Sequence, residues 1–294
     1  MLLKFAVGLP AFNEEGNIAP IIVKLKQLTD IIIVCDDGSS DLTSKIAIEL
    51  GAVTIVHKKN MGYGAAIASL FAKAKEMNVD ALITFDADGQ HRIEDIKTVL
   101  EPIIKNEADI VIGSRFVGSE SSVPKYREIG IKTITSITNV TTGTKMTDAQ
   151  SGFRAYNKKI LDSIIPSEYG MGVSTEILIK AAKNKFRIAE VPITILYEGD
   201  TSTHNPVSHG TSVVFSTIKY VALERPLSFY GIPGIIILFT GLFFVGWTLE
   251  DYSHSHTLIT NLTLIGVGST ILGVLLLMTA SILYSMVNII RERK

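Results

Sequence analysis

The sequence predicts an α/β domain built on a mostly parallel β-sheet, followed by a hairpin of two membrane-spanning helices. Two observations predict the domain. Short apolar runs alternate with helical segments through most of the chain, and polar clusters follow several of these runs. A third observation predicts the membrane hairpin, because the 68 residues from Leu227 onward carry only six charged side chains. A chain of 294 residues is long enough for both parts.

Five short apolar runs are expected to form the parallel strands. They are continuous rather than alternating, which is typical of strands buried on both faces. The expected strands are Phe5–Leu9, Ile31–Cys35, Val53–His57, Ala81–Phe85 and Ile110–Ile112. The helices expected between them are Ile18–Leu28, Leu42–Leu50, Gly64–Lys75 and Ile93–Ile104.

The C-terminal part contains two uncharged runs, and about 20 apolar residues cross a bilayer core. We therefore expect two transmembrane helices, near residues 231–249 and 262–286. The polar loop between them has no Lys or Arg, whereas both outer ends are flanked by such residues: Lys219, Arg225, Arg291, Arg293 and Lys294. The positive-inside bias then places both outer ends, and the α/β domain, in the cytoplasm. A buried helical hairpin in a soluble protein is the alternative.

The expected domain division is an α/β domain over 1–210, an amphipathic helix over 211–226 and a membrane anchor over 227–294. Ser212–Leu223 places its apolar side chains at helical spacing. This segment is expected either to lie in the membrane interface or to pack against the domain.

Composition excludes some classes of function. A formal net charge of −1 argues against a general nucleic-acid binder, which normally has a basic surplus. The single cysteine, Cys35, excludes an internal disulfide framework and a cysteine-rich zinc site. The mean hydropathy of +0.33 is high for a soluble protein and reflects the C-terminal runs.

Polar clusters follow four of the expected strands. In open parallel sheets the ligand crevice lies beyond the carboxyl ends of the strands. The clusters at these ends are Asn13-Glu14, Asp36-Asp37, Asp86-Ala87-Asp88 and Ser114-Arg115. Their shared position predicts one binding site at this edge of the sheet.

The cluster after Ala81–Phe85 suits a metal ion. A turn there lets Asp86, Asp88 and Gln90 reach one ion, and oxygen ligands favour a hard cation such as Mg²⁺ or Mn²⁺. The alternative is an ordinary aspartate-rich turn, since such turns are common.

Other motifs have two interpretations each. Asp36 and Asp37 either form turns before a helix capped by Ser40 or Asp41, or accept hydrogen bonds from a nucleobase or ribose. The glycines of Asn60–Ala65 are expected to permit a tight turn and close helix packing, because the full dinucleotide fingerprint is missing. A direct contact of this turn with a phosphate is the alternative.

Three arginines are candidate phosphate ligands, since arginine donates bidentate hydrogen bonds. They are Arg115, Arg127 and Arg154, and for each a structural or solvated role is the alternative. Arg115 is favoured by its position at a strand end.

Five sequence motifs follow one another along the chain: Leu9–Glu15, Asp36–Ser39, Asp86–His91, Gly113–Arg115 and Ser151–Arg154. Together they resemble the GT-A glycosyltransferases of family 2, and within them the dolichyl-phosphate mannosyltransferase and polyprenyl-phosphate glycosyltransferase group. The resemblance covers roughly Phe5 to Pro192, and the tail from Arg225 to Gly231 followed by two spans is similar to membrane-anchored members.

The resemblance implies a GT-A fold, a nucleotide-sugar donor and a role for each motif. The base and ribose would contact Pro10, Phe12, Glu14, Asp36 and Asp37. Asp86, Ala87 and Asp88 would lie along the diphosphate, with the metal on Asp88, Gln90 and Asp86. Arg115 would face the transferring sugar and the acceptor phosphate, and Arg127 would hold the lipid phosphate. One departure is a segment that is basic in many members but here carries acids and the histidines His204 and His209.

The expected function is transfer of one hexose, mannose from GDP-mannose first, to dolichyl or polyprenyl phosphate at the cytoplasmic membrane face. The reaction is expected to be metal-dependent and inverting. The alternatives are a UDP-glucose donor, a non-lipid hydroxyl acceptor, and a membrane-anchored sensor without activity. Glu176 is the candidate if a general base exists, and a helix-start carboxylate is its other interpretation. The oligomeric state stays open, a homo-oligomer included.

Overall fold

The computed structural model describes residues 3–118, 123–194, 222, 226–257 and 259–292. The chain divides into two compact units, Met1–Thr217 and Ile218–Lys294. Most of the expected amphipathic segment Ser212–Leu223, together with His204 and His209, lies outside the described residues.

The described part of the first unit contains a seven-stranded sheet in the order β3-β2-β1-β4-β6-β5-β7. β6 runs antiparallel to its neighbours β4 and β5, and every other pairing is parallel. The strands are β1 (Phe5–Ala11), β2 (Ile32–Asp36), β3 (Val53–Val56), β4 (Ala81–Thr84), β5 (Ile110–Ser114), β6 (Arg154–Asn157) and β7 (Ile188–Pro192).

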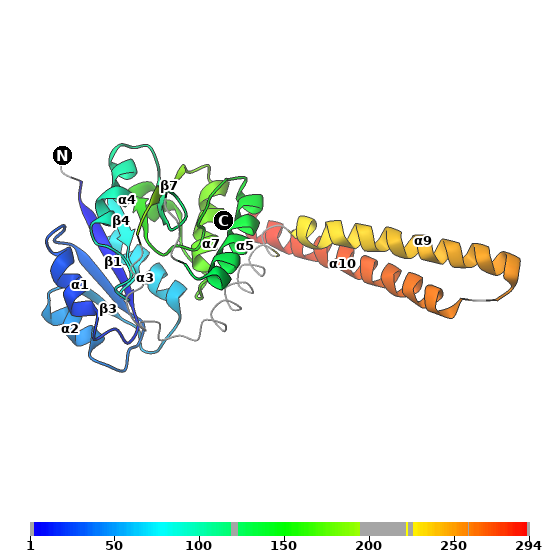
Figure 1. Ribbon diagram of the computed structural model, residues 1–294, viewed down its shortest axis with the longest axis horizontal. Helices are drawn as coiled ribbons and strands as arrows, with labels where there is room; N and C mark the ends of the chain where they lie inside the picture. The colour runs from blue at the N-terminus through cyan, green and yellow to red at the C-terminus, as the bar shows by residue number, and fades with distance from the viewer. Residues whose placement is uncertain (1–2, 119–122, 195–221, 223–225, 258, 293–294) are drawn as a thin grey trace. The chain divides into compact units, whose positions relative to one another are not determined.

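Helices connect the strands and are seen around the sheet in Figure 1. They are α1 (Ile18–Leu25), α2 (Thr43–Glu49), α3 (Tyr63–Glu76), α4 (Asp95–Ile104), α5 (Lys125–Thr142), α6 (Lys158–Ser163) and α7 (Val173–Lys183). The five strands and four helices expected from the sequence are therefore present as β1–β5 and α1–α4, with ends shifted by a few residues.

The strands β1, β2, β4 and β5 are buried on both faces because they carry apolar side chains at successive positions, and successive side chains point to opposite faces. In β1, Val7 and Leu9 join a core with α1 and α4, whereas Ala6 joins a second core with α3 and α7. Leu82 of β4 also belongs to the second core. The polar clusters stand at the ends of these buried strands.

The second unit consists of η1 (Leu227–Gly231), a π-helical turn, followed by α9 (Ile232–Ser255) and α10 (Thr260–Glu292). Two helical stretches, Leu227–Ser255 and Thr260–Val287, are long and apolar enough to cross a membrane. Only 17% and 11% of the residues in their most apolar stretches are buried, unlike the helices of a protein core. Both helices contain the expected spans and are longer.

α9 and α10 pack side by side along a seam of small residues (Figure 1). The buried residues of the seam recur every seven positions: Gly234, Gly241 and Thr248 on α9, and Gly266, Gly273 and Ala280 on α10. A Cβ on Gly241 would lie 2.5 Å from the Thr270 amide nitrogen. Such seams let helix backbones approach closely where lipid supplies no hydrophobic driving force.

Candidate active site

The site is built at the carboxyl ends of β1, β2, β4 and β5. β1 lies between β2 and β4, with Ala11 paired to Asp36 in register, so the clusters that follow these strands meet at one edge. The charges are close enough to interact. Burial raises the pKa of Glu14, and the negative charges of Asp88, Asp41 and Asp86 raise it further. Two of the predicted clusters are thereby brought together.

The loops after β1 and β2 are fastened to each other by side chains. The Asn13 amide donates to Ser39 Oγ at 2.9 Å, and Asn13 Oδ1 accepts from the Ser40 amide at 2.9 Å. The Glu14 amide donates to Thr43 Oγ1 at 2.8 Å. Asn13 adopts a positive φ of 56°, which asparagine tolerates better than most residues. Pro10 is buried at the end of β1 and Phe12 is half-buried beside this junction. These hydrogen bonds hold the loops after β1 and β2 in fixed positions relative to each other.

The Asp36-Asp37 pair is almost fully buried. Asp36 Oδ1 accepts from the Ser39 amide at 2.9 Å, as in the turn predicted by the first interpretation. Asp37 accepts from the amides of Met61 and Gly62 at 2.9 and 2.7 Å, and Asp37 Oδ1 lies 2.7 Å from His57 Nδ1. Asp37 therefore anchors the turn before α3. Contact of either carboxylate with the nucleobase or ribose of a nucleotide sugar stays a prediction.

His57 directly follows β3 and extends this network to α3 and β2. Its Nε2 lies 2.9 Å from Ser69 Oγ and 3.6 Å from the sulfur of Cys35. Burial, with the charge of Asp37, raises the pKa of Cys35 to about 12, so the thiol stays protonated and unreactive. Sequence reasoning missed His57, because the residues it joins lie far apart along the chain.

The glycines before α3 have the predicted role. Gly62 has a φ of +100°, and a Cβ there would lie 2.5 Å from the Tyr169 carbonyl oxygen. A Cβ on Gly64 would collide with the Glu168 carbonyl oxygen. The same Tyr169 carbonyl accepts from the Gly64 amide at 2.8 Å. The turn is tight and α3 begins in close contact with this backbone.

Asp86 is held on both carboxylate oxygens. The Tyr63 hydroxyl donates to Oδ1 at 3.2 Å, and His91 Nε2 lies 3.4 Å from Oδ2. A Cβ on Gly152 would lie 2.6 Å from both Asp86 Oδ2 and the Tyr63 hydroxyl, so a larger residue there would require these side chains to shift. Burial alone would raise the pKa of Asp86, but His91, Tyr63 and the charge of Arg115 outweigh it and hold the pKa below its usual value.

Asp88 follows Asp86 with only the buried Ala87 between them. Its Oδ1 accepts from the Gln90 amide at 3.0 Å. Burial and the charge of Asp86 raise the pKa of Asp88, so a cation would stabilise its ionised form. Two carboxylates and the Gln90 amide oxygen suit Mg²⁺ or Mn²⁺. Within the described residues, no group of three or more His, Cys, Asp or Glu side chains is arranged to hold a metal, so a cation here would need further oxygen ligands.

Arg115 follows β5 and is fixed by Asp148. Its Nε and Nη2 donate to the two oxygens of Asp148 at 2.6 and 2.7 Å. Its positive charge also contributes to lowering the pKa of Asp86. Arg127 lies in the first turn of α5, half-buried, and its role rests on the resemblance alone.

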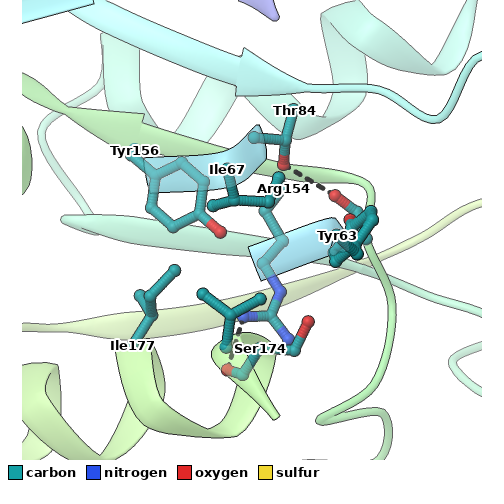
Figure 2. A pocket seen from close by; sticks show the side chains of 9 residues that line it. Tyr63, Ile67, Thr84, Arg154, Tyr156, Ser174 and Ile177 are labelled. Carbon is teal, nitrogen blue, oxygen red and sulfur yellow. Dashed lines mark hydrogen bonds between the residues drawn. The ribbon is translucent and has the colours of Figure 1, made fainter. Parts of the chain in front are cut away.

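Arg154 has the structural role that was its alternative. Its side chain is 1% exposed and donates to the carbonyl oxygens of Ser151, Ala149 and Ser174. Figure 2 shows its guanidinium beside Ser174 at the start of α7, in a narrow pocket lined also by Tyr63 and Tyr156. These backbone contacts occupy the groups that would clamp a phosphate.

Glu176 also has a structural role, as a carboxylate at the start of a helix. It is fully buried in α7 and accepts from the amides of Ser167 and Glu168, while Lys180 Nζ lies 2.6 Å from Oε1. Burial alone would raise the pKa of Glu176, but Lys180 and Ser167 outweigh it and lower the pKa. This geometry favours the structural interpretation over a general base.

The chain is similar to known sugar transferases over most of its length. Residues 6–165 match the model of glycosyl transferase family 2. The chain is 35% identical over 228 residues to a UDP-N-acetylglucosamine–dolichyl-phosphate N-acetylglucosaminyltransferase of Methanococcus voltae, covering 70% of this chain and 89% of the relative. It is 32% identical over 204 residues to a dolichol-phosphate mannosyltransferase of Pyrococcus furiosus, covering 65% and 56%.

The fold has a solved counterpart. Glucosyl-3-phosphoglycerate synthase of Mycobacterium tuberculosis, in complex with UDP, superposes with a TM-score of 0.60 at 21% identity, covering 74% of this chain and 80% of that one. Similarity at this level shows a shared GT-A-like architecture. With the family match over residues 6–165, it identifies the chain as a glycosyltransferase that belongs to glycosyl transferase family 2.

Proposed function

We propose that the protein transfers one sugar from a nucleotide-sugar donor to a dolichyl or polyprenyl phosphate at the cytoplasmic face of a membrane. The observation that carries this proposal is the joining of a family 2 domain to a hairpin of two apolar helices in one chain. Anchoring in the membrane would hold the transferase at high local concentration relative to a lipid-linked phosphate. Relatives named for dolichyl-phosphate transfer support the same acceptor.

The nucleotide-sugar donor is proposed to lie across the carboxyl ends of the strands, with its base and ribose on the loops after β1 and β2. This role falls to Pro10, Phe12, Glu14 and the Asp36-Asp37 pair, and the diphosphate would follow Asp86 to Asp88. GDP-mannose is the donor expected from the sequence. UDP-N-acetylglucosamine is the second candidate, favoured by the Methanococcus voltae relative, of which the alignment covers 89%.

Departure of the nucleoside diphosphate leaves negative charge that must be neutralised as it develops. Asp86, Asp88 and Gln90 would hold a divalent cation, which supplies Lewis-acid stabilisation of that charge. Arg115, kept in place by Asp148, would supply positive charge beside the transferring sugar and acceptor phosphate. Arg127 is proposed to bind the lipid phosphate.

The nucleophile would be an oxygen of the acceptor phosphate. A phosphomonoester has a second pKa of about 6, so it is largely ionised at neutral pH and needs no general base. This agrees with Glu176, whose carboxylate is occupied in fastening the start of α7. Attack by this oxygen opposite the leaving diphosphate would invert the anomeric centre.

The proposal is tested with purified full-length protein in detergent, dolichyl phosphate, Mn²⁺ and labelled GDP-mannose, UDP-glucose or UDP-N-acetylglucosamine. We expect organic-solvent-extractable label from one donor, lost with EDTA and in Asp88→Asn. Asp30→Asn, at an exposed aspartate away from the strand ends, is the matched control and should keep full activity. Failure of all three donors, or full activity of Asp88→Asn, would contradict the proposed donor and metal site.

A further inference from the structure

The best-defined polar network beside the proposed site links Arg115 to two carboxylates that the sequence analysis gave no role. Asp148 is fully buried and accepts from Arg115 Nε at 2.6 Å, from Nη2 at 2.7 Å and from the Arg115 amide at 3.2 Å. A bidentate pair fixes the plane of the guanidinium as well as its position. The exposed fraction of the Arg115 side chain is 17%, so solvent screens the pair only partly.

Asp148 is itself fixed by the strand next to β5. Glu190 lies in β7, opposite Ile112 of β5, and accepts from the amides of Thr147 and Asp148 at 2.8 and 2.9 Å. The Thr147 hydroxyl also lies 2.7 Å from the hydroxyl of Ser114, the last residue of β5. The segment that carries Asp148 is therefore tied to both β5 and β7, two strands that hydrogen-bond to each other.

We propose that Asp148 is the positioning residue of Arg115, and that Glu190 sets the position of Asp148. This inference rests on the proposed function, in which Arg115 stabilises charge that develops during transfer. Arginine has a long, flexible side chain, and stabilisation of a transition state depends on donors already in place when the charge appears. The network places the guanidinium before any substrate arrives. Asp148 touches no substrate in this scheme and acts through Arg115.

A purely structural role for Asp148 is the competing explanation, and the fold contains a matched control for it. Asp109 immediately precedes β5, at the opposite end from Arg115, and pairs with Arg187 at 3.2 Å. It is also a buried carboxylate, 5% exposed, and accepts from the Arg187 amide at 2.9 Å. Asp109→Asn removes a similar arginine pair without touching the strand-end site. It is expected to lower thermal stability and leave kcat unchanged.

The test measures transfer kinetics and thermal midpoint for the full chain in detergent. Asp148→Asn is expected to lower kcat by about 10- to 100-fold, the cost of a misplaced catalytic group, with little change in donor KM. Glu190→Gln keeps one acceptor oxygen and serves as the milder variant if Asp148→Asn folds poorly. It is expected to lower kcat by several-fold, also without a change in donor KM.

A double-mutant cycle decides whether Asp148 acts through Arg115. In an Arg115→Ala background, Asp148→Asn should cause no further loss of kcat, because residues that act as a unit are not additive. If the fold-losses of kcat in the two single variants multiply in the double variant, this inference alone is overturned. The same holds if Asp148→Asn has a parent-like kcat while Arg115→Ala is impaired. A parent-like kcat in Arg115→Ala would instead overturn the role of Arg115 in the proposed function, and this inference with it.

Discussion

The Tyr63 hydroxyl donates a hydrogen bond to Asp86 Oδ1 over 3.2 Å and so joins the first residue of α3 to the end of β4. Burial and the charge of Asp86 raise the pKa of Tyr63 well above its usual value, so the hydroxyl remains a donor. Asp86 is one of the proposed metal ligands, and partners that orient a ligand commonly tune metal affinity.

Tyr63→Phe is therefore expected to raise the Mn²⁺ concentration for half-maximal transfer by about 10-fold, since loss of such a partner costs 10- to 100-fold. The maximal rate at saturating Mn²⁺ should change less. A metal titration of transferase activity measures both quantities. An unaltered half-saturation concentration would show that Tyr63 does not orient a metal ligand.

Asp37 is expected to matter for stability. Asp37 is buried, and Asp37→Ala removes the carboxylate that accepts from the amides of Met61 and Gly62 and pairs with His57. The expected loss of folding free energy is on the order of 3 kcal/mol, since a hydrogen bond to a charged group contributes about 1.5–3 kcal/mol. Thermal unfolding in detergent checks this, with Asp30→Ala as the exposed control. Equal midpoints for the two variants would contradict the anchoring role.

The lowered pKa of Glu176 predicts how the stability of the fold depends on pH. Its folded pKa is lowered, so the unfolded chain binds its proton more readily and the carboxylate stabilises the fold at neutral pH. That contribution is present above the usual glutamate pKa and is lost as the pH falls through the lowered folded pKa. Glu176→Gln should thus be less stable than the parent at pH 7, with the difference narrowing in acid. Thermal midpoints measured across this range test the sign, and a difference that widens in acid would refute it.

The helical hairpin depends on its glycine seam. A Cβ on Gly241 would meet the Thr270 amide nitrogen and hydroxyl oxygen at 2.5 Å, whereas a Cβ on Gly268 of α10 has no neighbour within 4 Å. Gly241→Ala should lower the stability of the hairpin by about 1–3 kcal/mol, the usual range for overpacking. Gly268→Ala is the matched control. Thermal unfolding in mild detergent compares them, and equal midpoints would contradict the close packing of α9 and α10.

The sequence predicted β1 to β5 because each stands out as a short, mostly apolar run. β1, β2, β4 and β5 are buried almost throughout, whereas the edge strand β3 is only half-buried. It did not predict β6 or β7. β6 begins at Arg154, a buried arginine satisfied by three carbonyl oxygens, and β7 contains Glu190 and ends at Pro192. Polar residues of this kind interrupt the apolar pattern on which strand prediction depends.

The site was predictable to the extent that it follows strand ends. Asp86, Asp88 and Arg115 were found because they stand directly after buried strands. The partners Asp148 and His57 were not, since they meet Arg115 and Asp37 across 33 and 20 residues of chain. Spacing cannot reveal such contacts, because they depend on how the strands are ordered in the sheet.

The proposed acceptor is a lipid-linked phosphate. Two acceptors that differ only in the phosphate group test this proposal. Full-length protein is incubated with Mn²⁺ and the donor it uses, with either dolichyl phosphate or dolichol, and label is measured in the lipid extract. We expect label in dolichyl phosphate and none in dolichol, because only the phosphate is ionised at neutral pH without a base. Label in dolichol, or transfer to a soluble hydroxyl acceptor without any lipid, would contradict it.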